Sequence, residues 1–197
     1  MKIFAALLVA LSTSCALGGS PPKYNYYVLT PPAAPPSAPE QHQATPLVLA
    51  IGPIELPGYL DRDEVATRTS DYGIVYSNRD RWAEPLSDAF PGILRQCLAS
   101  RLSPQGISVQ ARRIGLVPDY ALQVELMRFE RRDDGHVELR ARWTLRSKAR
   151  LVRTHEVRIS EPTASAEGGA AAAALSRAID RLSAEVASAL RPELSAR

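Results

Sequence analysis

Side chains suited to acid–base or metal chemistry are sparse in this 197-residue sequence, and they lie far apart. Histidine, the usual proton carrier near neutral pH, occurs three times, at His42, His136 and His155. His155 is followed by Glu156, but both fall in a predicted strand, where adjacent side chains point to opposite faces. The pair therefore cannot share a proton or a metal ion, and the histidines predict no catalytic centre.

A short acidic segment is the other feature that suggests a site for chemistry. Asp61, Asp63 and Glu64 could hold calcium, but the segment lacks the glycine and the terminal glutamate of an EF-hand loop, so loop solvation explains it better. The sequence contains no G-x-S-x-G, H-E-x-x-H, glycine-rich phosphate loop or paired-cysteine zinc pattern. We therefore predict a protein that is not an enzyme and uses no metal or cofactor. A deep pocket with convergent carboxylates or a histidine would revive the enzyme hypothesis.

The first residues have the layout of a cleaved signal peptide. Lys2 supplies a positive start, Ile3–Leu11 is an unbroken apolar run, and small polar residues lead to Cys15. A helix that spans a bilayer permanently needs roughly 20 apolar residues, so this run is too short for one. Residues 1–14 are therefore predicted to be a signal peptide.

Cys15 is predicted to carry a lipid. In bacterial lipoproteins a cysteine after small residues is alkylated by diacylglycerol and becomes the new N-terminus. This segment resembles such a lipobox, although Ser12 stands where the pattern prefers leucine, and ordinary signal cleavage nearby is the alternative. Lipid chains contribute about 0.8 kcal/mol per buried methylene, so several chains anchor a protein firmly. Ala16, which is not an aspartate, implies the periplasmic side of the outer membrane under enteric-type sorting.

The remaining cysteine and the overall charge do not indicate a specific function. Cys97 falls on the apolar face of a predicted helix, where a small buried hydrophobe is favoured over a disulfide. The formal net charge is +3, and it comes from scattered arginines without the dense basic and aromatic cluster of a nucleic-acid binder. No nucleic-acid partner is therefore expected.

Composition divides the rest of the chain into a tether and a domain. Residues 15–46 are predicted to be a lipid anchor and a proline-rich tether, because Pro, Ala, Gly and Ser cannot build a core and prolines favour extended chain. Within it, the tyrosines and aliphatic residues of 24–29 favour an edge strand of the main sheet. Residues 47–192 are predicted to be the globular domain.

The first half of the domain predicts short strands followed by a helix. Residues 47–54 are typical of a buried strand that stops at Gly52-Pro53, and 65–68 and 72–77 of two short paired strands. Trp82, Glu84 and Pro85 are predicted to open a helix whose apolar stripe runs to Leu102. Pro91 should kink or split this helix, because proline lacks the N–H for one backbone bond.

The second half predicts a meander and a final helix. Alternating apolar residues from Tyr120 to Leu145 surround the turn Asp133-Asp134-Gly135, and 151–159 supplies a third strand. A helix is expected over 167–190, with Pro192 following it. These elements predict an α+β fold: a two-layer domain with a largely antiparallel sheet and two helices packed on one face. The other face should carry the arginines.

Two segments suggest recognition of a partner. The first is a Pro- and Gly-braced loop, and the second precedes the first helix, where Trp and Arg are typical of interface hot spots. The predicted partner-binding residues are Leu56, Pro57, Tyr59, Leu60, Arg81, Trp82 and Pro85. The alternatives are a loop folded back on the core and a core tryptophan. The row of Arg140, Arg142 and Arg146 predicts either contact with anionic headgroups or an acidic partner, or a plain solvated face.

Several motifs occur in an order that points to one family. They are Tyr26-Tyr27-Val28-Leu29, Gly52-Pro53-Ile54, Leu56–Arg62, Arg81–Leu86, Asp119-Tyr120, Arg128-Phe129-Glu130 and Leu175-Ser176-Arg177. With the proline-rich start and the alanine-rich final helix, the chain resembles the ABC-type transport auxiliary lipoproteins, the PqiC/YmbA-like group. The imperfect lipobox, the long proline-rich stretch after Leu29 and Pro91 depart from the pattern.

The resemblance implies a role in the cell envelope. Such lipoproteins sit in the outer membrane and work with inner-membrane MCE proteins, whose tubes move lipids or other hydrophobic molecules between the membranes. It implies an MCE-domain partner of an ABC-type or related transporter, a membrane contact through the N-terminal lipid, and no catalytic residues. A homo-oligomer is plausible, because a tube end invites a symmetric cap. The alternative is a structural lipoprotein that assists insertion of outer-membrane proteins or lipopolysaccharide.

Overall fold

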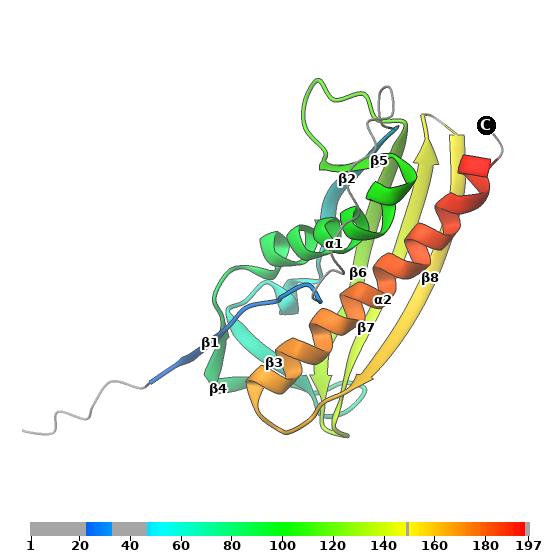
Figure 1. The fold of residues 1–197 in the computed structure, drawn as a ribbon. Coiled ribbons are helices and arrows are strands. Elements are labelled where there is room, and N and C mark those ends of the chain that lie inside the picture. The colour runs from blue at the N-terminus through cyan, green and yellow to red at the C-terminus, as the bar shows by residue number, and fades with distance from the viewer. Residues whose placement is uncertain (1–22, 33–46, 149, 196–197) are drawn as a thin grey trace, which may run out of the picture.

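The computed structural model describes residues 23–32, 47–148 and 150–195 (Figure 1). The predicted signal peptide, Cys15, His42 and residues 33–46 of the predicted tether lie outside these ranges. The elements in chain order are β1 (Asn25–Tyr27), β2 (Leu47–Glu55), the 3₁₀ turn η1 (Gly58–Leu60), β3 (Glu64–Arg68), β4 (Ile74–Trp82), α1 (Leu86–Leu102), the 3₁₀ turn η2 (Ser103–Gln105), β5 (Ile107–Ala111), β6 (Tyr120–Arg132), β7 (His136–Ser147), β8 (Arg150–Pro162) and α2 (Gly168–Ser195).

Strand β6 is the centre of the sheet. Tyr120, Leu122 and Val124 alternate with polar residues, so one face of the strand is apolar and packs in the core. β7 pairs with β6 in antiparallel register along one edge, and the predicted turn at Gly135 joins the two strands with a positive φ of 81°. β8 extends the meander by pairing with β7, as the alternation predicts.

The other edge of β6 pairs with two strands in succession. β2 runs parallel to its first half and β3 parallel to its end, while β5 extends the sheet beyond β2. β4 is antiparallel to β3, and β1 lies at the sheet edge, parallel to β4. The α+β prediction is confirmed: the eight-stranded sheet is mixed, with its longest ladders antiparallel.

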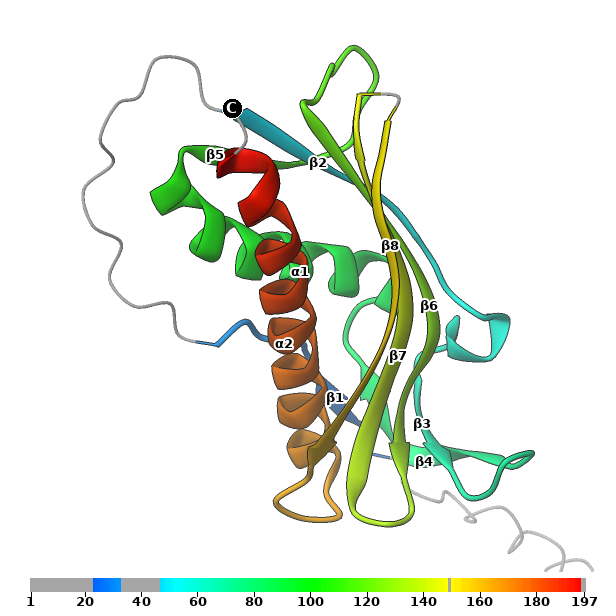
Figure 2. The same cartoon turned by 90° about the vertical axis from the view of Figure 1, so that its right-hand side faces the viewer.

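Two helices cover one face of this sheet (Figure 2). α1 packs on β2 and β5, α2 packs on β7 and β8, and the helices also pack on each other. Their contact includes an ion pair from the Arg101 Nη2 to the Asp180 Oδ1, 2.6 Å apart. Ala171 and Ala174 are buried, which lets the start of α2 approach the sheet closely. The predicted arrangement of two helices on a single face is therefore confirmed.

Two expectations about the helices were wrong, and of the two alternatives for Pro91 the split does not occur. Trp82 and Glu84 do not open α1, because Trp82 still pairs as the last residue of β4 and the helix begins at Leu86. Pro91 does not split α1, since its missing hydrogen bond falls near the exposed start of the helix. Pro192 does not follow α2 but lies inside it, near its C-terminal end.

Glycine and proline do not stop β2 where the sequence suggests. The strand continues to Glu55, with a register shift against β6 between Ile51 and Ile54. Gly52 fits this irregularity because a Cβ there would come within 3.3 Å of the Leu122 carbonyl oxygen. Gly52-Pro53 therefore bends the strand and leads it toward the loop that follows.

Candidate functional site

The loop between β2 and β3 closes a gap beside β6. Pairing of β2 with β6 ends at Glu125, and pairing of β3 with β6 begins at Arg131. Residues 56–60 bridge this gap on the side of the sheet away from the helices (Figure 2). The loop is wound into η1, where the Leu60 N–H donates to the Pro57 carbonyl at 2.9 Å. The Pro/Gly-braced segment thus takes the place of a missing strand.

Tyr59 anchors this loop to β6. Its hydroxyl oxygen lies 2.7 Å from the Glu130 Oε2 and 3.3 Å from the Met127 carbonyl oxygen. Its own carbonyl accepts a hydrogen bond from the Tyr76 hydroxyl at 3.1 Å, so β4 also holds the loop. Burial, followed by the hydrogen bond to Glu130, raises the pKa of Tyr59 well above its ordinary value. The phenol therefore stays protonated and remains a donor.

Glu130 is the acceptor at the centre of this arrangement, and only 1% of its surface is exposed. Its carboxylate accepts from the Phe129 N–H at 2.8 Å and from the Arg68 Nε at 2.6 Å, in addition to Tyr59. The Arg68 guanidinium also lies 5.7 Å from the centre of the Tyr59 ring. The buried Glu130 carboxylate is thus paired with the Arg68 cation and accepts two further hydrogen bonds. These contacts join β3, β6 and the loop.

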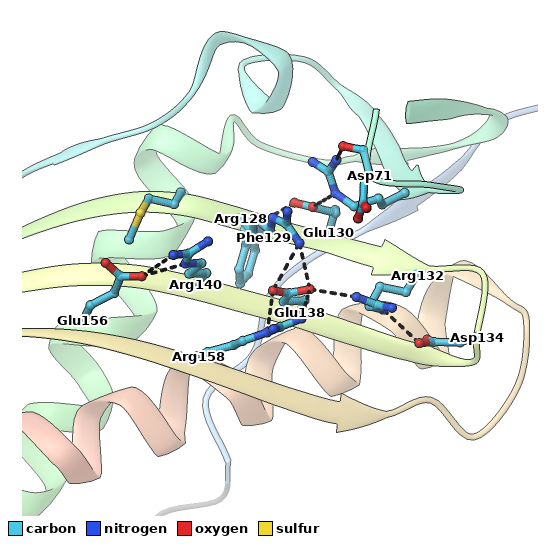
Figure 3. Close-up of polar contacts among 12 residues, drawn as sticks. Asp71, Arg128, Phe129, Glu130, Arg132, Asp134, Glu138, Arg140, Glu156 and Arg158 are labelled. Atoms are coloured by element: carbon cyan, nitrogen blue, oxygen red, sulfur yellow. Dashed lines mark hydrogen bonds and ion pairs between the residues drawn. The ribbon is translucent and has the colours of Figure 1, made fainter. Parts of the chain in front are cut away.

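A second buried carboxylate, Glu138, stands directly opposite Glu130 on β7 and is also 1% exposed. Like charges opposite each other destabilise a sheet, so each needs its own cations. Arg128, Arg132 and Arg158 surround Glu138, with Arg158 Nε 2.9 Å from Oε1 and Arg132 Nη1 3.1 Å from Oε2 (Figure 3). Burial raises the pKa of Glu138, but these arginines outweigh it and hold the pKa below its ordinary value.

The predicted arginine row lies on this outer face, and two of its members are paired. The Arg140 Nε donates to Glu156 at 2.7 Å, and the Arg142 Nη1 donates to Glu125 at 3.0 Å. Arg146 is exposed at the end of β7. The pairing of Arg140 and Arg142 supports the interpretation of a solvated, self-neutralised sheet face over a site for external anions.

The segment before α1 is largely built into the fold. The Trp82 side chain is buried, and the backbone N–H of Trp82 donates to the Asp63 carbonyl at 2.6 Å. The Arg81 Nη1 donates to the Ser77 carbonyl at 2.6 Å, and its guanidinium lies 4.8 Å from the Tyr24 ring centre. Pro85 is exposed and caps α1, since its carbonyl accepts from the Ala89 N–H.

The described residues offer little for catalysis or metal binding. No group of three or more His, Cys, Asp or Glu that could hold a metal ion occurs within the described ranges. A groove of about 630 Å³ beside β1 is lined by Asp80 and Glu167 but by no histidine. Both Asp80 carboxylate oxygens accept hydrogen bonds, from Asn25 and Ser77, each at 3.0 Å. Of the two carboxylates in the groove, that of Asp80 is therefore already hydrogen-bonded within the fold.

His155 and Cys97 also have structural surroundings. The Nε2 of His155 lies 4.0 Å from the Glu185 carboxylate of α2, while Glu156 faces Arg140 on the opposite side of the sheet. The prediction that the two neighbours cannot share a ligand is confirmed. Cys97 is free and buried in α1, and burial raises the pKa of its thiol to about 11. It is a small core residue, as predicted.

The sequence model of the ABC-type transport auxiliary lipoprotein component matches residues 27–187, which is most of the chain. The chain belongs to this auxiliary lipoprotein family. The match begins within β1 and ends in α2, so it covers the sheet, both helices and the braced loop. The family role is that of an auxiliary component of transport, and such a role requires no catalytic group.

Two curated relatives of this family member are the intermembrane transport lipoproteins PqiC of Escherichia coli (strain K12) and of Shigella flexneri. Each is 32% identical over 108 residues, which cover 54% of this chain and 55% of the relative. The chain thus spans about half the length of the curated relatives it matches. The aligned half is similar enough to indicate common ancestry but not to transfer the whole protein's activity.

Solved structures share the fold of this auxiliary lipoprotein. The crystal structure of an uncharacterized protein matches with a TM-score of 0.71 at 23% identity, covering 84% of this chain and 97% of that one. A protein from Xanthomonas campestris matches with a TM-score of 0.64 at 20% identity, covering 82% and 92%. Both likenesses concern the fold alone.

The structure brings some of the predicted partner-binding residues together but covers several of them. Leu60 and Trp82 are buried, whereas Leu56, Pro57, Tyr59 and Arg81 are partly buried and Pro85 is exposed. They occupy the same part of the sheet, since the Trp82 N–H bonds to Asp63 just after the loop. Within the loop, the Tyr59 side chain holds the backbone against β6 through its hydrogen bonds to Met127 and Glu130.

Sequence reasoning missed the carboxylates that organise this site. Glu130 was noted only as part of a family motif, and Glu138 only as a polar residue in an alternating strand. Asp119 has a structural role that its place in a family motif does not reveal: its Oδ2 accepts from the Val48 N–H at 3.0 Å, joining β2 to the start of β6. The signal that could have found Glu138 is its setting among Arg128, Arg132 and Arg140, an unusual density of cations on paired strands.

Proposed function

We propose that this protein is lipidated at Cys15 and docks an MCE-type ABC transport system from the periplasmic side of the outer membrane. In this role it would help to move lipids or other hydrophobic molecules between the inner and outer membranes. The family match over residues 27–187 carries the proposal, because it begins shortly after the predicted anchor. The name of the relatives, intermembrane transport lipoprotein, supports transport between membranes.

The proposal assigns a task to each part of the chain. Residues 1–14 would be removed as a signal peptide, 15–46 would supply the lipid anchor and tether, and 47–192 would form the docking domain. Within the described residues, no helix is both long and apolar enough to cross a membrane. A lipid on Cys15 would attach the protein to the membrane.

Rigidity suits a docking part. The braced loop and both buried carboxylates fix the outer face of the sheet with charge-assisted hydrogen bonds, which are stronger than neutral ones. Contact of the partner with Leu56, Pro57, Tyr59, Leu60, Arg81, Trp82 and Pro85 stays a prediction. The buried members, Leu60 and Trp82, would affect partner binding indirectly, by fixing the backbone of the surface that the partner contacts. Assembly into a symmetric homo-oligomer also stays part of the proposal.

A fractionated pull-down from the native host tests this function, comparing wild type with Cys15→Ala. We expect the wild type in the outer-membrane fraction together with an MCE-domain protein, and the variant released from the membrane. Mass spectrometry of the N-terminal peptide should show the diacylglycerol on wild type alone. Recovery of outer-membrane assembly proteins in place of an MCE protein would contradict the proposal and favour a structural lipoprotein.

A further inference from the structure

The loop between β5 and β6 exposes two aliphatic side chains, Ile114 and Val117. Ile114 is fully exposed and Val117 is 89% exposed, and the two lie three residues apart in the same loop. We call residues 112–118 the tip. Single apolar residues on a surface are normal, but two such residues in one short loop with almost no covering are informative, because exposing apolar surface to water is unfavourable.

The tip is held firmly at its base. The Arg112 N–H donates to the Ile51 carbonyl at 2.7 Å, and the Lys148 N–H donates to the Asp119 carbonyl at 3.3 Å. Within the loop, the Leu116 N–H donates to the Arg113 carbonyl at 3.2 Å, and Gly115 supplies a left-handed turn with φ of 82°. The two aliphatic side chains are therefore presented by a structured turn that three strands support.

The charge of the tip differs from that of the sheet. Arg112 and Arg113 are exposed, and neither guanidinium has an ion-pair or hydrogen-bond partner among the residues that the structure describes. Arg146 and Lys148, at the adjacent turn after β7, add exposed positive charge to the same end. On the outer face, by contrast, Arg68, Arg128 and Arg140 are all paired with carboxylates. The tip thus combines apolar surface with uncompensated positive charge.

The tip lies at the end of the domain opposite to the start of the described chain (Figure 2). β6 runs from the tip toward Ala166, whose carbonyl accepts from Arg131, and its 13 residues span about 40 Å at about 3.3 Å each. Tyr27 packs there against Gly168, at the start of α2. Exposed tyrosines at this end, Tyr26 and Tyr72, are of the type found at membrane interfaces.

The short segment between Cys15 and the domain limits how far each end of the domain can lie from the membrane. Only seven residues lie between Cys15 and Lys23, so an extended chain keeps Lys23 within about 28 Å of an anchor at Cys15. The tip lies a further strand length from that anchor, at the opposite end of the domain (Figure 2). A membrane contact would suit the tyrosine end, and a contact across the periplasm would suit the tip.

We infer that the tip also meets the transport partner, in addition to the contacts predicted at 56–60 and 81–85. This partner is a protein that presents carboxylates around an apolar socket. Such a socket would bury Ile114 and Val117 at its centre, while Arg112 and Arg113 would pair with its acidic rim. This inference rests on the proposed function, since it names a further surface by which an anchored auxiliary lipoprotein would dock its MCE-type partner.

Binding of the full-length lipoprotein, reconstituted in phosphatidylethanolamine/phosphatidylglycerol nanodiscs, to the periplasmic region of the MCE-domain protein from the same bacterium tests it. We expect Ile114→Ser with Val117→Ser to weaken the affinity roughly tenfold or more, because buried anchors dominate interfaces. Arg112→Gln with Arg113→Gln should weaken it and reduce its salt dependence. The matched control, Tyr72→Ser with Val75→Thr, removes exposed apolar surface at the other end and should leave the affinity within about twofold.

The outcomes separate this inference from the proposed function. Wild-type binding that neither tip variant weakens would overturn the tip assignment and leave the docking function standing. Absence of wild-type binding would overturn both. A parallel flotation of the Cys15→Ala chain with phosphatidylglycerol vesicles identifies the other occupant. Vesicle binding that the tip variants abolish, with partner affinity unchanged, would assign the tip to a lipid surface and overturn the inference.

Discussion

The outer face of β6 and β7 and the tip after β5 both carry arginines, but they use them differently. On the outer face, Arg68 reaches Glu130 at 2.6 Å and Arg158 reaches Glu138 at 2.9 Å, and both carboxylates are buried. At the tip, Arg112 and Arg113 stand beside exposed aliphatic side chains and have no charged partner within the described part of the chain.

The difference teaches which charges belong to the fold. The outer-face arginines compensate carboxylates that face each other across paired strands, so their removal would leave buried negative charge. The tip arginines compensate nothing in the described chain, so the fold does not explain them. Substitutions at the two regions should therefore separate stability from partner binding.

The largest effect is expected at Arg68. Arg68→Ala leaves the Glu130 carboxylate buried without its cation, which should lower the free energy of unfolding by about 3–5 kcal/mol. Urea denaturation measures the loss. Arg62→Ala is the matched control, because its ion pair with Glu64 is solvent-exposed, and ion pairs of this kind contribute little to stability. A loss at Arg68 no larger than that at Arg62 would show that the outer face is not held by its buried charge.

Tyr59→Phe should have the next largest effect. The variant keeps the ring but removes the hydroxyl that bonds Glu130 at 2.7 Å, and a hydrogen bond to a charged group contributes about 1.5–3 kcal/mol. The same urea experiment measures it, with Tyr72→Phe as the control because Tyr72 is 99% exposed. Equal stability of both variants would contradict the anchoring role of Tyr59.

Acid should destabilise the fold through carboxylates that neighbouring arginines keep ionised. The arginines hold the pKa of Glu138 below its ordinary value of 4.5, and the pKa of Glu161 is lowered in the same direction by Arg181 and Arg177 against the effect of burial. A carboxylate with a depressed folded-state pKa contributes stability above its unfolded pKa and loses it as the pH falls through the folded value. Unfolding free energy should thus be level at neutral pH and fall below about pH 4.5.

Glu138→Gln checks the source of that acid dependence. The variant should be less stable at neutral pH, and its stability should fall less steeply than that of wild type between pH 4.5 and more acidic conditions. Wild type and variant are compared by urea unfolding across a pH series. Parallel curves would assign the acid dependence to other carboxylates.

The smallest effect on stability is expected at the tip. Arg112→Gln with Arg113→Gln should change the free energy of unfolding by less than about 0.5 kcal/mol, since neither side chain contacts a described charge. Thermal and urea unfolding measure it alongside Arg68→Ala. A loss comparable to that of Arg68→Ala would mean that the tip arginines also belong to the fold.

Local patterns predicted the elements of this domain better than their partners. The alternation from Tyr120 to Leu145 predicted β6, its turn at Gly135 and β7, because strand periodicity is written in neighbouring residues. The parallel pairing of β2 with β6 joins segments about 70 residues apart and has no local signal. The parallel pairs that make the sheet mixed therefore could not be predicted from local sequence patterns.

The site was harder to predict for a related reason. Glu130 and Glu138 occupy polar positions of alternating strands, which normally face solvent, and they are buried only because the loop around Tyr59 and neighbouring arginines cover them. The tip carried no periodic pattern either, since Gly115 and Pro118 interrupt its apolar residues. Whether those residues are exposed depends on tertiary packing.

Site-specific photo-crosslinking in the native envelope tests the central claim most directly. A photoreactive amino acid replaces Ile114 at the tip or Tyr72 at the opposite end, both fully or almost fully exposed positions. Crosslinking at position 114 to an MCE-domain protein, with none at position 72, is the result predicted here. A crosslink to that protein from position 72 alone, or from position 114 to phospholipid alone, would contradict the account.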